Sequence, residues 1–330
     1  MNRKVSVAPM MDCTDKHERF FLRLISKNVL LYTEMIVSEA IDRGDRQKLL
    51  SFNLEEKPVA LQLGGSSPKL LSNAAKIGEE FGYDEINLNL GCPSKKVQKN
   101  KFGACLIKEP NLVADCLNEM QSKTNLPVTV KTRIGYDQVE DYEHLHNFIK
   151  LLKATGVKTF IIHARKAMLG KFTPKQNLNI PPLKYEMVYK LKEDFNELNI
   201  IINGGITSPD QIKDHIKKVD GVMIGRSIYH SPYLLADIEK EIFNNHDVPS
   251  RQEVVEKLVR YLKNEVKKGT RVNQVMRHTL GLFHGQTGSN FWKRYLSENM
   301  CVRDADIQKV NHILDKVKLN HVTQPIRQID

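Results

Sequence analysis

The stretch NIIINGG, residues 199–205, is a short β-branched run that ends in a polar residue and two glycines. An uninterrupted apolar run of this length is typical of a strand that is buried on both faces, as in a parallel sheet. Similar near-continuous runs recur at residues 5–9, 29–35, 58–63, 85–91, 127–133, 159–165 and 220–226. Amphipathic stretches of helical length, such as residues 68–82, separate them. Eight strand–helix units predict an α/β fold built on a TIM (β/α)8 barrel.

The pattern after Tyr229 is helical only, at residues 232–243, 251–269, 272–285, 291–299 and 306–318. Residues 244–250, NNHDVPS, have the composition of a linker. We therefore expect a TIM-barrel catalytic domain over residues 1–244 and a C-terminal all-α helical bundle domain over residues 245–330.

The composition limits the class of protein. Lys and Arg number 50 against 39 Asp and Glu, and residues 246–330 carry 15 of the former against 9 of the latter. Such an excess often marks a polyanionic partner, although it can also serve only solubility. The five cysteines show no C-x-x-C spacing, so we expect neither a disulfide framework nor a metal site. With no apolar run of roughly 20 residues and no apolar signal core, we expect a cytoplasmic protein without membrane contact.

Polar residues follow the predicted strands. In a TIM barrel the active site lies at the carboxyl ends of the strands. Any single one of these positions could be an ordinary loop residue or cap, but all eight ends contribute candidates. The candidates are residues 9–12, Glu34, Gln62, residues 89–92, Lys131, Arg133, His163, Arg165, residues 203–205 and residues 225–226.

The last two strands end in the glycine-rich turns NGGI and IGRS. Loops at this position commonly hold a phosphate, because glycine lets backbone N–H groups approach an anion and Arg226 adds a forked charge. A phosphorylated cofactor would then lay its ring toward Gln62, Lys131 and His163. Gln62 suits the imide edge of a flavin, and Lys131 can stabilise the charge of a reduced one. The alternatives are a strand-end salt bridge for Lys131 and a structural role for His163.

Cys92 lies in the turn NLNLGCPSKKV, residues 87–97, where we expect Gly91 to permit a tight turn and Pro93 to stiffen it. A thiol with an ordinary pKa near 8.5 is mostly protonated at neutral pH. No His or Asp in this loop would activate it as a thiolate. We therefore expect Cys92 to donate a proton, with a buried structural cysteine as the alternative.

Taken together, several motifs resemble those of the tRNA-dihydrouridine synthases, most closely the bacterial DusA subfamily that modifies D-loop positions 20 and 20a. The resemblance runs over nearly the whole chain, in order. The motifs are APMMDCTDKHER at residues 8–19, NLNLGCPSKKVQKNKFGACL at 87–106, VKTRIGYD at 130–137, HARKAMLGKFTPKQNLNIPPLKY at 163–185, INGGI at 202–206, GVMIGRSIYHSP at 221–232 and FWKRYLSEN at 291–299.

The resemblance implies an enzyme that uses flavin mononucleotide (FMN) and NADPH to reduce the 5,6 double bond of uracil in tRNA. Hydride would reach carbon 6 from the flavin, and Cys92 would protonate carbon 5 of a base flipped out of the tRNA stack. The barrel domain would bind the flavin and the helical domain the tRNA. Separately, we expect a monomer and no protein partner. The implied flavin-binding residues are Pro9, Met10, Met11, Gln62, Lys131, His163, Asn203, Gly204, Gly205, Gly225 and Arg226.

The implied tRNA contacts are Asn89, Lys175, Leu178, Lys293 and Arg294, with Arg165 and Lys166 as further candidates. Leu178 departs from the pattern, because the subfamily usually has arginine there and leucine cannot contact phosphate. Two other functions remain open: a flavin-dependent barrel oxidoreductase with a small substrate, and a tRNA-binding protein without catalysis. The basic C-terminal region disfavours the first, and the intact Cys92, Lys131 and His163 disfavour the second.

Overall fold

The computed structural model describes residues 2–170, 172–302 and 309. Its sheet has eight parallel strands in the order β1-β8-β7-β6-β5-β4-β3-β2. The predicted α/β fold is therefore confirmed, and every predicted strand is present. The strands are β1 (Val5–Val7), β2 (Leu31–Val37), β3 (Val59–Gly64), β4 (Glu85–Leu90), β5 (Val128–Arg133), β6 (Thr159–His163), β7 (Asn199–Asn203) and β8 (Gly221–Ile224).

The two ends of the sheet meet beside β1. Its residues pair with β8 on one side, and Ser6 forms a parallel bridge with Leu30, directly before β2, on the other. The N–H of Val7 donates to the carbonyl of Leu30 over 2.9 Å, and the N–H of Leu30 donates to the carbonyl of Val5 over 3.2 Å. These bonds close the sheet into a barrel, as the sequence pattern predicts.

The barrel belongs to a compact unit made of residues 2–16 and 29–225. Helices follow the strands within it, several of them capped by the serine or aspartate that precedes the first turn, as at Ser67, Asp141 and Ser208. These helices are α2 (Ser38–Arg43), α3 (Arg46–Leu50), α4 (Pro68–Glu80), α5 (Lys95–Lys99), α6 (Pro110–Gln121), α7 (Tyr142–Lys153), α8 (Pro174–Asn179), α9 (Tyr185–Asp194) and α10 (Pro209–Ile216), with 3-10 turns η1 (Leu54–Glu56) and η2 (Gly103–Lys108).

The interior of the barrel has an apolar and a polar part. A buried cluster joins side chains from strands that are not neighbours, which is possible only inside the barrel; it comprises Ala8, Leu30, Tyr32, Ala60, Ile161, Ile201 and Met223. Strands β4 and β5 differ from the near-continuous apolar runs expected of them. Their sequences EINLNL and VTVKTR alternate, and the polar members bond to one another across β3, β4 and β5. This alternation places a polar strip along one side of the interior.

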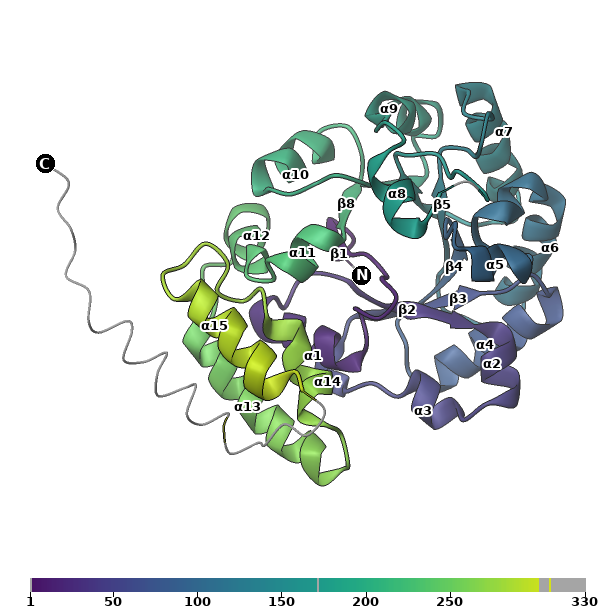
Figure 1. The fold of residues 1–330 in the computed structure, drawn as a ribbon. Helices are drawn as coiled ribbons and strands as arrows, with labels where there is room; N and C mark the ends of the chain where they lie inside the picture. Colours follow the sequence, from purple (N-terminus) through teal and green to yellow (C-terminus); the bar gives the residue numbers. More distant parts are fainter. Residues whose placement is uncertain (1, 171, 303–308, 310–330) are drawn as a thin grey trace, which may run out of the picture. The chain divides into compact units, whose positions relative to one another are not determined.

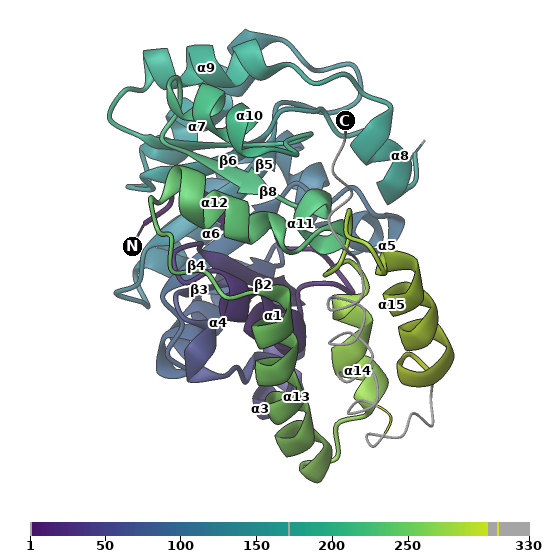
Figure 2. The ribbon, with the colours of Figure 1, turned by 90° about the vertical axis from the view of Figure 1, so that its left-hand side faces the viewer.

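A second compact unit consists of residues 17–28 and 226–302. Figures 1 and 2 show α13, α14 and α15 side by side in it. The predicted last helix, residues 306–318, lies outside the described residues apart from Lys309, and the functional domain boundary at residue 244 stays a prediction. The helices of the unit are α1 (Lys16–Ile25), α11 (Arg226–His230), α12 (Leu234–Ile242), α13 (Arg251–Lys267), α14 (Val272–Met276) and α15 (Ser289–Tyr295), with η3 (Arg277–Thr279) and the π-helical turn η4 (Leu296–Met300).

Two buried side chains tie this second unit together. The Glu239 carboxylate accepts hydrogen bonds from the Ser26 hydroxyl, from the N–H and amide of Asn28, and from the amide of Asn245. Trp292 is buried and donates its indole N–H to the carbonyl of Thr279 over 2.8 Å. Among the described residues, no helix combines the length and the apolar character that crossing a membrane requires.

We expect Ser250→Ala to lower the free energy of unfolding of the second unit by about 1 kcal/mol, because Ser250 caps α13 in a reciprocal box with Glu253. Trp292 is the single tryptophan of the chain, so its fluorescence during denaturant unfolding reports on this unit. Ser297→Ala is the matched control, because the Ser297 hydroxyl only bonds back to the carbonyl of Lys293. Equal unfolding midpoints for the two variants would contradict the capping assignment.

Candidate active site at the carboxyl ends of the strands

The candidate flavin-binding residues of the first unit gather at one end of the barrel because all eight strands are parallel. Gln62 lies in β3 and Lys131 in β5, while His163 and Asn203 are the last residues of β6 and β7. The remaining flavin candidates lie just beyond strand ends: Pro9, Met10 and Met11 beyond β1, Gly204 and Gly205 after β7, and Gly225 after β8. The candidate acid Cys92 lies two residues beyond β4. Arg226 comes next along the chain, is exposed, and begins α11 of the second unit.

Hydrogen bonds fix the turn that carries Cys92 on three sides. The Asn89 amide oxygen accepts the N–H groups of Gly91 and Cys92, each over 3.0 Å. Arg133 Nε donates to the carbonyl of Gly91 over 2.8 Å, and the carbonyl of Cys92 accepts the N–H of Ala104 over 3.0 Å. The thiol is therefore held on a rigid turn and is partly exposed.

The glycine that shapes this loop is Gly103 rather than Gly91. Gly91 lacks a positive φ, and a Cβ there would lie 3.5 Å from the carbonyl oxygen of Lys131, which is ordinary contact. Gly103 has φ +73°, and a Cβ there would approach the carbonyl of Cys92 to 2.7 Å. The expectation that Gly91 permits the turn is therefore wrong. Asn89 sets the turn through its side chain, and Gly103 permits the close approach of η2.

Arg133 is a buried arginine that joins two loops. Besides the carbonyl of Gly91, it contacts the carbonyls of Lys166 at 3.1 Å and Asn177 at 3.3 Å, both between β6 and the end of α8. Burial lowers the pKa of Arg133 to about 10, while charge on the nearby Cys92 sulfur acts in the opposite direction. The Cys92 turn and the segment that carries Lys175 are thus connected through one guanidinium.

Lys131 reaches across the mouth from β5 to β7, where its amine donates to the Asn203 amide oxygen over 3.1 Å. The Asn203 amide in turn donates to the carbonyl of Met223 over 2.8 Å. Burial and then the charge of Arg133 lower the pKa of Lys131 to about 7. Within the described residues Lys131 has no acidic partner, so the alternative of a strand-end salt bridge is not found. Its charge will respond to an anion placed beside it.

The turn after β7 needs both of its glycines. Gly204 and Gly205 have φ of +123° and +73°, and added Cβ atoms would meet the Leu183 side chain at 2.9 and 2.6 Å. The Tyr185 hydroxyl fixes the turn by donating to the carbonyl of Gly204 over 2.7 Å. His163 is buried beside the same glycine, because a Cβ on Gly204 would lie 3.4 Å from His163 Cε1.

Three backbone N–H groups without an acceptor in the described residues indicate a possible anion site. Those of Gly204, Gly205 and Gly225 donate to no other residue in the part of the chain that the structure describes. A Cβ on Gly225 would be 3.5 Å from both Ala8 and Met10, so packing within the protein does not require glycine there. Unpaired amides on glycines can approach a phosphate closely.

The segment after β1 forms a tight loop at the same end. The carbonyl of Met10 accepts the N–H groups of Cys13 and Thr14, and the N–H of Met10 donates to the Thr14 hydroxyl over 3.0 Å. Asp12 has φ +61° within this loop. Met11 is left 54% exposed, which makes it one of few large apolar side chains on the surface of the described residues. Such a side chain offers a surface for a flat ring.

The candidate tRNA contacts are spread over both units. Asn89 is buried and its amide is used inside the protein, whereas Lys175 is exposed in the first turn of α8. Lys293 is half-buried and Arg294 exposed, both in α15 of the second unit. Leu178 is half-buried in α8, Lys166 pairs with Glu140 over 3.0 Å, and Arg165 donates to the carbonyl of Pro181. Their contact with tRNA stays a prediction.

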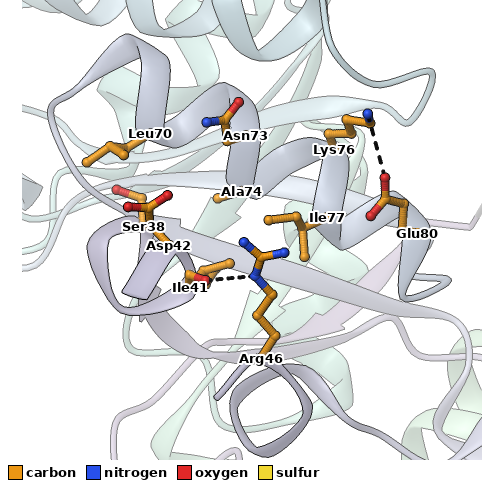
Figure 3. A pocket seen from close by; sticks show the side chains of 10 residues that line it. All are labelled: Ser38, Ile41, Asp42, Arg46, Leu70, Asn73, Ala74, Lys76, Ile77 and Glu80. Atoms are coloured by element: carbon orange, nitrogen blue, oxygen red, sulfur yellow. Dashed lines mark hydrogen bonds and ion pairs between the residues drawn. The ribbon is translucent and has the colours of Figure 1, made fainter. Parts of the chain in front are cut away.

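A separate hollow of about 230 Å³ lies between α2, α3 and α4 (Figure 3). Arg46 lies within it and donates to the carbonyl of Ile41, while Lys76 and Glu80 form an ion pair across 3.8 Å at its edge. None of the candidate site residues lines this hollow. No cluster of three or more metal-ligating side chains occurs among the described residues.

Glu85, Asn87 and Thr129 are functional candidates that the strand pattern alone does not single out. These buried polar residues occupy alternate positions of β4 and β5 and bond directly or through one another to Gln62. A period of two, with polar residues at every second position, indicates that those residues share one face. In a closed barrel that face is the interior, so the alternation could have identified them.

Comparison with known proteins gives the family of this chain. A family model described as dihydrouridine synthase (Dus) matches residues 6–318. The tRNA-dihydrouridine(20/20a) synthase of Synechocystis sp. is 52% identical over 302 residues, covering 91% of this chain and 90% of the relative. The proteins of the same name from Shewanella oneidensis and Escherichia coli K12 are each 49% identical, covering 98% and 95% of this chain and 97% and 91% of the relatives.

Among solved structures, a 2-naphthoyl-CoA reductase complex superposes with a TM-score of 0.54 at 12% identity, covering 73% of this chain and 50% of the other. A likeness at this identity shows the barrel fold alone. The family match over most of the chain and the 49% to 52% identities to full-length relatives establish more than the fold. The chain belongs to the dihydrouridine synthase family.

Proposed function

We propose that this protein is a tRNA-dihydrouridine synthase, which reduces the 5,6 double bond of uridines at positions 20 and 20a of the tRNA D-loop with NADPH as reductant. Relatives with this activity in their names align over more than nine tenths of the chain. The observation that carries the proposal is the rigid turn at Cys92, beside the two cations of β5. We further propose that it acts in the cytoplasm as a monomer.

The residues at the barrel mouth fit flavin mononucleotide. The Gln62 amide makes two hydrogen bonds within the protein, and the described residues leave one N–H and one lone pair unused. That pair matches the alternating acceptors and donor of a flavin imide edge. The unpaired N–H groups of Gly204, Gly205 and Gly225 suit its phosphate. Arg226 would add charge to that phosphate.

When bound, flavin mononucleotide supplies the hydride for carbon 6 of the uracil. Cys92 gives the proton of its thiol to carbon 5, and its sulfur is left as a thiolate. Lys131 and Arg133 stabilise that thiolate, since charge on the sulfur raises the pKa of both cations. The three anchors of the turn hold the sulfur in place, so little reorganisation accompanies the transfer.

The target uridine must leave the tRNA stack to reach the mouth of the barrel. We propose that Lys175 contacts the tRNA from α8, and that Lys293 and Arg294 contact phosphates from α15. Leu178 stands where the subfamily usually has a cation and offers only apolar contact. Asn89 can offer the tRNA no more than its one remaining N–H, because its oxygen accepts two backbone N–H groups and its other N–H donates to Gln62.

We expect Cys92→Ala to keep its flavin and its affinity for tRNA but to reduce uridine about 10²- to 10⁴-fold more slowly, because only the proton donor is removed. Single-turnover formation of dihydrouridine measures this rate. Cys105→Ala is the matched control, since the Cys105 thiol donates only to the carbonyl of Phe102 in the same loop region. Near-normal turnover by Cys92→Ala would contradict the assignment.

We expect Arg226→Glu to release flavin mononucleotide during purification, because a carboxylate next to Gly225 repels the phosphate. Absorbance at visible wavelengths gives the occupancy. Arg260→Glu, an exposed position in α13, makes the same change of charge elsewhere in the second unit and should purify with full occupancy. Full occupancy of Arg226→Glu would show that the phosphate lies elsewhere.

We expect Lys293→Ala/Arg294→Ala to weaken tRNA binding and to flatten its salt dependence, since each neutralised phosphate contributes a slope of about −0.9 on duplex. Flavin reduction by NADPH should be unchanged. Lys263→Ala/Lys267→Ala removes the same charge from exposed positions of α13 in the same unit. If both double variants weaken binding equally, net charge and not a contact at α15 explains the affinity.

A further inference from the structure

A continuous row of buried hydrogen bonds runs through the barrel interior from the Cys92 turn toward the opposite end. It begins where the N–H of Cys92 donates to the Asn89 oxygen over 3.0 Å. The Asn89 amide donates to Gln62 Oε1 over 2.8 Å, and Gln62 Nε2 donates to the Asn87 oxygen over 2.7 Å. These three side chains are buried in β3 and β4.

From Asn87 the row continues away from the mouth, through Thr129 of β5, and ends on the Glu85 carboxylate. The Asn87 amide donates to the Thr129 hydroxyl oxygen over 2.8 Å, and that hydroxyl donates to Glu85 Oε1 over 2.7 Å. Glu85 is fully buried and also accepts the Tyr32 hydroxyl at 2.7 Å and Arg3 at 2.6 Å. We call the set Asn89, Gln62, Asn87, Thr129 and Glu85 the interior polar row.

The two ends of the interior polar row impose the same direction on it. A carboxylate accepts only, so the single hydroxyl hydrogen of Thr129 points to Glu85 and its oxygen faces the Asn87 amide. At the other end a backbone N–H donates only, so the oxygen of Asn89 must face Cys92. Between these fixed ends, each amide has one orientation in which every bond pairs a donor with an acceptor.

We propose that Asn87, Thr129 and Glu85 are positioning residues that orient the Gln62 amide and steady the Cys92 turn. The proposal deepens the proposed function, because the unused N–H and lone pair of Gln62 are the groups offered to the flavin. The direction of the row decides which side of the Gln62 amide carries the unused N–H and which side carries the unused lone pair. Glu85 is the first residue of β4, at the end of the strand away from the mouth, so it would act only through the other residues of the row.

Thr129→Val tests the row at its middle, because valine keeps the shape and removes the only hydroxyl between Asn87 and Glu85. Thr129→Ser keeps the hydroxyl and should behave as the wild type. Thr132→Val is the matched control: Thr132 is equally buried in β5, but its hydroxyl only approaches the carbonyl of Arg133 at 3.4 Å. Asn87→Leu breaks the same row one bond higher and provides a second test if Thr129→Val does not fold.

Two readouts separate positioning from plain stability. One is the dissociation constant of free flavin mononucleotide, followed by fluorescence quenching on the deflavinated full chain. The other is the rate of Cys92 alkylation by iodoacetamide without flavin, mapped by peptide mass spectrometry. We expect Thr129→Val and Asn87→Leu to weaken flavin binding about tenfold and to change the alkylation rate severalfold, the scale of one lost buried hydrogen bond. Thr129→Ser and Thr132→Val should change neither.

If Thr129→Val and Thr132→Val stay within twofold of each other in both readouts, the interior polar row serves only to satisfy buried groups and the proposal is wrong. A wild-type protein that binds no flavin mononucleotide would instead contradict the proposed function. In that case the alkylation rate alone decides whether the row positions Cys92, so the two failures are distinguishable.

Discussion

A polar group buried inside the closed barrel costs free energy unless it finds a partner there, and the Glu85 carboxylate at one end is the strictest case. A buried charge costs several kcal/mol unless it is paired and hydrogen-bonded. Arg3, Tyr32 and Thr129 meet that requirement with bonds of 2.6 to 2.7 Å. Because the Thr129 hydroxyl donates its only hydrogen to Glu85, the other members of the interior polar row cannot exchange donor and acceptor roles. The chemistry offered at the mouth is thus constrained from the far end of the strands.

The mouth itself has two sides with different properties. On the side of β3, β4 and β5, side chains present fixed donors and acceptors and two cations whose pKa values are lowered by burial. On the side of β7 and β8, the backbone of Gly204, Gly205 and Gly225 presents unpaired N–H groups. An aromatic ring system with a polar edge and a phosphate tail needs both sides. Arg133 extends the first side outward, since it joins the Cys92 turn to the segment carrying α8.

Much of the fold follows from local patterns in the sequence. The eight strands lie within one or two residues of their predicted positions, because short apolar runs between turn residues have few alternatives in a chain of this length. Helix starts such as Ser67-Pro68 are equally visible, since a capping serine followed by proline fits only the first turn.

The site could be predicted only in part. Cys92, Lys131 and the Gly204–Gly205 turn lie in short local motifs, so the sequence alone was enough to propose them as site residues. The role of Asn89 in holding the Cys92 turn could not be predicted, because its bonds to Gln62 and to that turn depend on how β3 and β4 align. The prediction for Gly91 was wrong for a related reason. A glycine in a sequence indicates that a left-handed backbone conformation is possible there, but only the structure shows which glycine adopts it. Here Gly103 adopts it and Gly91 does not. Long-range register was the missing information.

We propose that this chain reduces uridine in the D-loop of tRNA through Cys92. The most direct measurement maps dihydrouridine at single-nucleotide resolution in tRNA from cells that lack the protein and from the same cells given back either the wild-type chain or Cys92→Ala. We expect dihydrouridine at positions 20 and 20a to be absent without the protein, to return with the wild-type chain, and to stay absent with Cys92→Ala. An unchanged level at both positions in the cells lacking the protein would contradict the account.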